Sequence, residues 1–155
     1  MNKKKLYVFD DFVWRSSWMD PHVSESERLH NHQDFKFLFN KYASDINEYL
    51  VVRKVKIIDF DGNYKLPQLK WNNGLIEIMF IDCGRTIEAN DAWYKIFQPY
   101  FIPDNTILIM QDWGLHKEVP VQSYNQTKQF TDSKGSSLQL IHEIKRGNIG
   151  AFIYR

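Results

Sequence analysis

Three apolar runs of the chain end at an acidic residue with a glycine close behind, and this repeated ending constrains the fold more than any other feature. The runs are "LVVRKVKIIDFDG" at 50–62, "LIEIMFIDCG" at 75–84 and "NTILIMQDWG" at 105–114. Their β-branched and aromatic content is typical of β-strands. A shorter run, "LYVFDDF" at 6–12, also stops on acids. We therefore predict four strands that carry carboxylates at their carboxyl ends.

Helices are predicted between these strands. From Asp34 onward the apolar side chains recur at the spacing of one helix face. They are Phe35, Leu38, Phe39, Tyr42, Ile46 and Tyr49. A second helical face spans 89–100, and we predict a crossover helix from Thr86 to Gln98 that the following prolines close. The resulting order is strand, helix, strand, helix, strand.

This alternation predicts an α/β fold with a mostly parallel sheet and helices on both of its faces. The last segment, "LQLIHEIKRGNIGAFIYR" at 138–155, differs because it contains two alternating runs around Arg146, Gly147 and Asn148. Such a pattern predicts an antiparallel hairpin. No repeat or linker divides the sequence, so we predict a single domain over 1–155.

Composition excludes several classes of protein. The chain has 20 basic and 19 acidic residues, and its formal net charge is +1. A nucleic-acid-coating protein usually has a strong basic excess, so no nucleic-acid partner is expected. No apolar run approaches the ~18 residues of a membrane span, so no membrane partner is expected either. The single cysteine, Cys83, excludes an intramolecular disulfide and fits a reducing compartment. We expect a cytoplasmic location.

The strand ends supply the candidate site residues. In a doubly wound sheet, ligands bind beyond the carboxyl ends of the strands. The polar residues at these ends are Asp10, Asp11, Asp59, Asp61, Asp82, Gln111 and Asp112. Acids also occur at such positions as helix caps, where they accept hydrogen bonds from backbone amides. For each acid, therefore, the sequence leaves a capping role and a site role open.

The same motifs resemble the class I S-adenosylmethionine-dependent methyltransferases, most closely the macrocin O-methyltransferase type. "YVFDDF" resembles the "FDSF" strand end of that family, and "FIDCGRTIEAND" resembles its "IDGD" strand end with a glutamate on the next helix. "LIMQDWG" resembles a strand that ends in two aspartates, and "PYFIPDNTILI" is similar to the family's "PxLxPGGxxI". The resemblance runs from Leu6 to Tyr154 and implies a Rossmann-like fold.

The resemblance also implies roles for particular residues. It implies methyl transfer from S-adenosylmethionine to a hydroxyl of a small molecule or sugar. Asp10 is expected to contact the ribose of the cofactor, and Asp59 or Asp61 to lie near the adenine. Asp82 resembles the acid that orients the acceptor hydroxyl and helps to hold a divalent cation such as Mg²⁺, and Asp112 resembles the second acid of that site.

The chain departs from this family where the first strand and its glycine-rich loop are expected. No G-x-G occurs in the sequence, and Gly84, Arg85 and Gln111 stand where the family often has an acid, a histidine and an aspartate. We therefore predict an N-terminally truncated domain, either a part of a longer enzyme or a remnant without catalysis. The alternative is a non-catalytic interaction module, because a missing strand leaves an edge that another chain can fill. A homo-oligomer is expected under either reading, because a missing strand leaves apolar surface that a partner usually buries.

Overall fold

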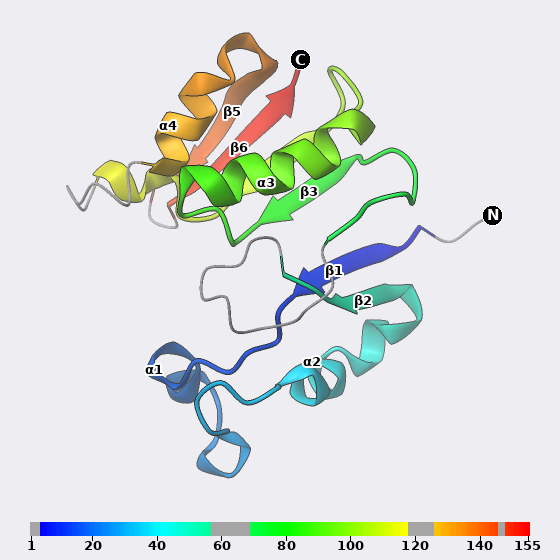
Figure 1. Ribbon diagram of the computed structural model, residues 1–155, viewed down its shortest axis with the longest axis vertical. Helices are drawn as coiled ribbons and strands as arrows, with labels where there is room; N and C mark the ends of the chain where they lie inside the picture. Colours follow the sequence, from blue (N-terminus) through cyan, green and yellow to red (C-terminus); the bar gives the residue numbers. More distant parts are fainter. Residues whose placement is uncertain (1–3, 57–68, 118–125, 146–147) are drawn as a thin grey trace. The chain divides into compact units, whose positions relative to one another are not determined.

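The computed structural model describes residues 4–56, 69–117, 126–145 and 148–155 (Figure 1). The chain divides into two compact units, residues 1–69 and 70–155, and each is treated by itself. The candidates Asp59 and Asp61 lie outside the described residues, as does the end of the predicted strand at 50–62. The single domain over 1–155 stays a prediction.

The first unit contains a two-stranded parallel sheet. Strand β1 (Leu6–Asp10) pairs with β2 (Leu50–Lys54), and the register sets Leu6 opposite Leu50 and Asp10 opposite Lys54. Parallel strands need a long crossover between them. Here the crossover is helical, and its elements are α1 (Ser16–Met19), η1 (Asp20–His22), η2 (Glu25–Glu27), α2 (Lys36–Tyr42) and η3 (Ser44–Tyr49).

An aromatic cluster forms the core of this unit immediately after β1. Phe12 and Trp14 are each only 1% exposed. The Phe12 ring lies 5.3 Å from that of Phe35 and 5.5 Å from that of Phe39, and Phe35 also contacts Trp14. Edge and tilted contacts of this kind are favourable because the ring edge of one side chain meets the negative face of the other. The cluster thus ties the chain after β1 to the start of α2.

The predicted helix from Asp34 is shorter than its apolar pattern indicates. The α-helical part, α2, ends at Tyr42, and the 3₁₀ helix η3 follows over Ser44–Tyr49. Ala43 between them has φ −92° and ψ 11°, outside the α-helical region. Ser44 and Asp45 favour this break, since their short polar side chains compete for backbone hydrogen bonds. The prediction of one continuous helix to Tyr49 was therefore wrong.

The second unit contains a four-stranded mixed sheet in the order β3-β4-β6-β5. Strands β3 (Ile78–Ile81) and β4 (Ile107–Met110) are parallel, whereas β6 (Ile149–Tyr154) runs antiparallel to β4 and to β5 (Leu138–Ile144). A register shift between Leu140 and His142 bulges β5. The C-terminal hairpin is confirmed, and its second strand inserts between β4 and β5.

The two faces of this sheet differ in burial. One face carries Ile81, Leu108, Met110 and Phe152, all at most 3% exposed. Helices α3 (Ile87–Phe97) and α4 (Gln126–Ser133) pack on each other, with the ring centroids of Trp93 and Phe130 5.4 Å apart. Figure 1 shows α3 running along the sheet. The opposite face carries Ile78 and Phe80, which are 65% and 55% exposed, and half-buried side chains. The half-buried ones are Ile107, Ile109, Ile149, Ala151 and Ile153.

These observations confirm an α/β fold, but the larger sheet of the described residues is mixed, with one parallel and two antiparallel pairings, rather than mostly parallel. The predicted crossover helix from Thr86 to Gln98 corresponds to α3, with Thr86 as its N-cap and Gln98 as its C-cap. The described strands form two sheets rather than one. Helix α4 was not predicted, because Phe130 is its only large apolar residue and such a segment has no helical periodicity.

Candidate functional site

Asp82 and Asp112 lie at the same edge of the sheet in the second unit. Each follows a strand of the parallel pair β3 and β4, whose last residues, Ile81 and Met110, are register partners. The Gln111 amide donates to the Ile81 carbonyl oxygen at 3.0 Å, so the ladder continues to the tips. Adjacent strands lie about 4.8 Å apart. The expectation that both acids share one edge therefore agrees with the register.

The environment of Asp82 disfavours its charged form. Desolvation by the surrounding protein is the main cause that raises the pKa of its carboxyl group, and the negative charge of Asp112 raises it further. Arg85 acts in the opposite direction and lowers it. The Asp82 side chain is nevertheless exposed to solvent. A raised carboxyl pKa at a strand tip is a mark of a functional acid or base.

Arg85 holds Asp112. Its Nε and Nη2 lie 2.9 and 2.8 Å from Oδ2 of Asp112, in a charge-assisted pair across the two strand tips. Asp112 itself adopts φ 62°, a left-handed conformation that non-glycine residues rarely take. Such strain is often found at functional sites. Arg85 was noted in the sequence only as a departure from a family pattern, and its pairing with Asp112 was not predicted.

The capping role that the sequence left open for Asp82 is filled by another residue. Thr86 is the N-cap of α3, and its side-chain oxygen accepts the amide of Ala89 at 3.1 Å. Within residues 4–56, 69–117, 126–145 and 148–155, the Asp82 carboxylate accepts no hydrogen bond. Asp82 is therefore available to a ligand in the described part of the chain, whereas Asp112 is neutralised by Arg85.

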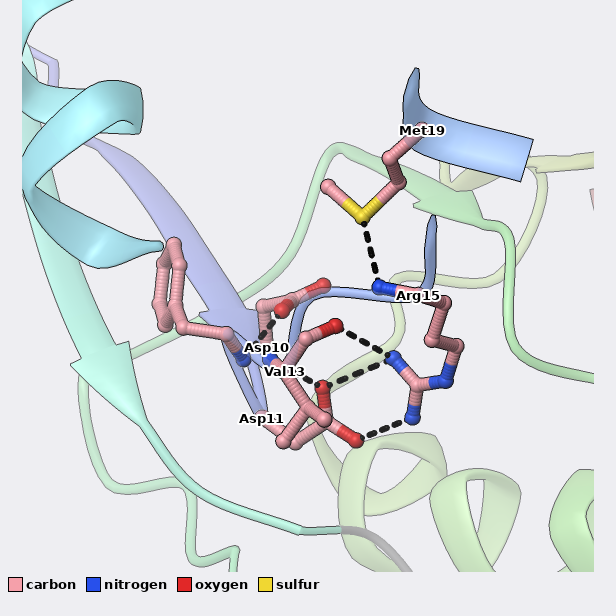
Figure 2. A network of polar contacts seen from close by, with 6 residues as sticks. Asp10, Asp11, Val13, Arg15 and Met19 are labelled. Carbon is pink, nitrogen blue, oxygen red and sulfur yellow. Dashed lines mark hydrogen bonds and ion pairs between the residues drawn. The ribbon is translucent and has the colours of Figure 1, made fainter. Parts of the chain in front are cut away.

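Asp10, the expected ribose contact, lies in the first unit and is engaged by its own backbone. Its Oδ1 accepts the amide of Phe12, a residue with φ 53°. Asp11 accepts the amide of Val13 at 3.0 Å and pairs with Arg15 at 2.6 Å. Figure 2 shows this network, with the Arg15 guanidinium reaching both Asp11 and the Val13 carbonyl oxygen. These acids shape the turn after β1.

The residues at the β3 and β4 tips do not fit a divalent cation. Asp82 and Asp112 supply carboxylates from two residues, but the Arg85 guanidinium already occupies Oδ2 of Asp112. In the described part of the chain, no group of three or more His, Cys, Asp or Glu side chains is arranged to hold a metal ion. Hard cations prefer six or more oxygen ligands.

A shallow hollow of about 550 Å³ lies elsewhere in the second unit. It is lined by Gly135, Ser136, Leu138, Gln139 and Arg155. The register pairs Leu138 with Tyr154 and Ile107 with Ile153, so this hollow is at the amino ends of β3 and β4. It thus lies at the edge of the sheet opposite to Asp82 and Asp112.

No protein-family model matches the chain, and no curated protein matches it either. Among the helices of the described residues, none has both the length and the apolar character that crossing a membrane requires.

Proposed function

We propose that the β3 and β4 tips form the acceptor side of a methyl-transfer site, in a Rossmann-like domain that acts on a hydroxyl of a small molecule or sugar. When bound, S-adenosylmethionine would supply an electrophilic methyl group, and the broken sulfur–methyl bond would leave S-adenosylhomocysteine. The observation that carries the proposal is the juxtaposition of Asp82 and Asp112 on paired parallel strands, with Arg85 neutralising Asp112 and leaving Asp82 as the accessible base. The sequence motifs that resemble the methyltransferases support it.

Asp82 is assigned the proton chemistry of this site. An ionised carboxylate accepts a hydrogen bond from the acceptor hydroxyl and takes its proton when the hydroxyl oxygen is methylated. A raised pKa makes that carboxylate a stronger base in its ionised form. The Arg85 guanidinium pairs with Oδ2 of the neighbouring Asp112, so Asp82 is the carboxylate assigned as the base.

Of the three cofactor-binding candidates, Asp10 lies among the described residues. Asp10 presents an exposed carboxylate at the end of β1, and the Phe12 amide fixes its direction. The ribose contact that the family resemblance implies for Asp10 stays a prediction. No glycine occurs among residues 11–20, so the backbone there does not offer the close approach that glycine permits. We therefore expect binding of S-adenosylmethionine weaker than micromolar.

A transfer assay tests the proposal. The chain is incubated with methyl-labelled S-adenosylmethionine at millimolar concentration and with a panel of sugars and phenols. We expect label on an acceptor hydroxyl, and a loss of about 10²-fold or more in Asp82→Asn, the usual contribution of a general base. Asp132→Asn, an exposed acid of α4, is the matched control and should transfer at the wild-type rate. Absence of transfer by the wild type, or equal rates in Asp82→Asn, would overturn the proposal.

The apolar face of the second sheet favours a second candidate, a module that assembles with its own copy. Ile78 and Phe80 are more than half exposed, and the half-buried residues beside them on β4 and β6 are also apolar. Exposed apolar surface of this kind usually marks an interaction site. None of the β3, β4 and β6 side chains on this face is charged, so two copies can meet without burying an unpaired charge.

Light scattering at increasing protein concentration tests this candidate. We expect a dimer for the wild type and a monomer for Phe80→Lys, because the lysine charge would be buried between the copies. Leu75→Lys is the control, since Leu75 is 69% exposed but precedes β3. A wild-type monomer at high concentration, or a dimer that survives Phe80→Lys, would exclude self-association through this face.

A further inference from the structure

A buried asparagine side chain hydrogen-bonds the loop between β3 and α3. Asn90 lies in the first turns of α3 and is 0% exposed. Its Nδ2 donates to the carbonyl oxygens of Gly84 at 2.6 Å and Thr86 at 2.9 Å, while its Oδ1 accepts from Nε1 of Trp93 at 2.9 Å. The asparagine amide thus uses both donors and its acceptor. A buried amide is costly unless it is bonded in this way.

Gly84 is the complement of Asn90. A Cβ atom at Gly84 would stand 2.2 Å from Oδ1 of Asn90, a distance that no side chain can occupy. The Gly84 carbonyl oxygen also accepts from Oγ1 of Thr127 at 2.6 Å, and Thr127 belongs to α4. Gln126, also from α4, accepts the Ile87 amide at 3.0 Å. Side chains from two helices therefore converge on one short loop.

These hydrogen bonds involve the same loop that carries the candidate site residues. Asp82 precedes Gly84 by two positions, and Arg85 follows it by one. Connecting loops are usually the mobile parts of a fold. Here buried or half-buried side chains hydrogen-bond both the loop carbonyl groups and the start of α3. The backbone of Arg85 is therefore fixed, and its side chain pairs with Asp112 from that fixed position. Functional side chains need this kind of support to hold their geometry.

We propose that Asn90 is a positioning residue, which fixes the loop at 82–86 and thereby the arrangement of Asp82, Arg85 and Asp112. The catalytic consequence rests on the proposed methyl-transfer function, but the positioning itself does not. Without the Asn90 amide, the Gly84 carbonyl oxygen keeps the Thr127 hydroxyl as its donor among the described residues. The Thr86 carbonyl oxygen loses its side-chain donor. The loop then samples other conformations, and the ion pair of Arg85 with Asp112 is populated less.

The test replaces Asn90 with leucine, which has a similar volume and no donors. Nuclear magnetic resonance then measures three properties of the full chain: the Arg85 Nε–H signal, the titration of the Asp82 carboxyl carbon, and amide hydrogen exchange at Ile87 and Ala89. We expect loss of the Arg85 signal, an altered Asp82 titration and exchange about tenfold faster, as the loss of a hydrogen bond predicts. Thr127→Val removes one bond to Gly84 and should give smaller changes of the same kind, which keeps the test usable if Asn90→Leu fails to fold.

Thr106→Val is the matched control. Thr106 is equally buried, and its hydroxyl bonds the Ile76 carbonyl oxygen and the Ile102 amide at the opposite end of β4. This variant should lose stability yet leave the Arg85 and Asp82 signals unchanged. Unchanged signals in folded Asn90→Leu or Thr127→Val, or equal changes in Thr106→Val, would overturn the inference. None of these measurements needs a cofactor, so a failure of the methyl-transfer proposal leaves their outcome unaffected.

Discussion

The tip of β1 and the tips of β3 and β4 contain the same kinds of side chain, two aspartates and one arginine, but they use them differently. After β1, Asp10 and Asp11 bond the amides two residues ahead, and Arg15 is only four residues from Asp11. At the β3 and β4 tips the acids come from different strands, and Arg85 reaches Asp112 across 27 positions.

This difference separates acids that shape a turn from acids that form a site. The contacts of Asp10 and Asp11 follow from local sequence, since aspartate readily bonds the backbone two residues on. Asp82 and Asp112 come together because β3 and β4 pair in register. Their grouping does not arise from hydrogen bonds between each side chain and its own turn. An acid at a strand end is thus a stronger site candidate when its carboxylate does not hydrogen-bond the backbone of the turn that follows.

The largest expected effect comes from the loop of the second unit, because that loop is fixed by distant partners. Gly84→Ala places a Cβ against Asn90 and breaks the buried network. We expect a loss of about 2–4 kcal/mol in the free energy of unfolding, from overpacking plus lost hydrogen bonds. Urea denaturation measures it. Asn90→Ala in the same chain should relieve the clash, so a strictly additive double mutant would contradict the arrangement.

A smaller effect is expected at β1, where the partners are local. Asp11→Ala removes the acceptor of the Val13 amide and the partner of Arg15, and should cost about 1 kcal/mol of unfolding free energy. Asp11→Asn keeps an oxygen for the Val13 amide and should lose about half as much. Equal losses in both variants would show that the ion pair, and not the turn, dominates this tip.

The third prediction concerns the charge balance at the second tip. Arg85→Met removes the cation that lowers the pKa of Asp82 and leaves the charge of Asp112 unpaired. The pKa of Asp82 should therefore rise further, which carbon-detected titration follows, while the unfolding free energy changes by less than about 1 kcal/mol. Arg15→Met, the equivalent change at β1, should leave the Asp82 titration as it is. A fall in the Asp82 pKa would refute this account of the site.

The smallest effects are opposite pH dependences in the two units. Hydrogen bonds from Lys41, Tyr42 and Ser24 lower the pKa of Glu27 from 4.5 to about 2, so its stabilisation is present above 4.5 and is lost as pH falls toward 2. Asp82 has a raised pKa, so its contribution is present below 3.8 and is lost as pH rises through the raised value. Unfolding of Glu27→Gln and Asp82→Asn across acid pH should show opposite trends relative to wild type; parallel trends would contradict one assignment.

The segment from β3 to β4 was predictable from sequence because its signals are local. Thr86 begins α3, and Ala89, Trp93 and Phe97 recur on its buried face. The hairpin of β5 and β6 was predictable for the same reason, since two alternating runs flank a turn. Both predictions needed only patterns within single helices, strands and turns.

The rest depends on contacts that sequence order does not contain. Neither the separation of the strands into two sheets nor the pairing of Arg85 with Asp112 follows from periodicity, because each joins distant segments. Asn90 gave one signal that was overlooked. Asn90 is a polar residue next to Ala89 on the apolar face of a predicted helix. A buried amide at such a position implies hydrogen-bond partners in the segments packed against that face.

The insertion of β6 between β4 and β5 also determines when the sheet can form. Strand β6 follows both of its neighbours in the chain, yet it supplies the hydrogen bonds that join them. During synthesis β4 and β5 emerge before the strand that pairs them, and their edges stay open until residues 149–154 arrive. Pairing between distant segments is slow to form, and open strand edges in such intermediates tend to aggregate. The yield of folded protein should therefore depend on how soon β6 is released, and a chaperone that shields β4 should raise it.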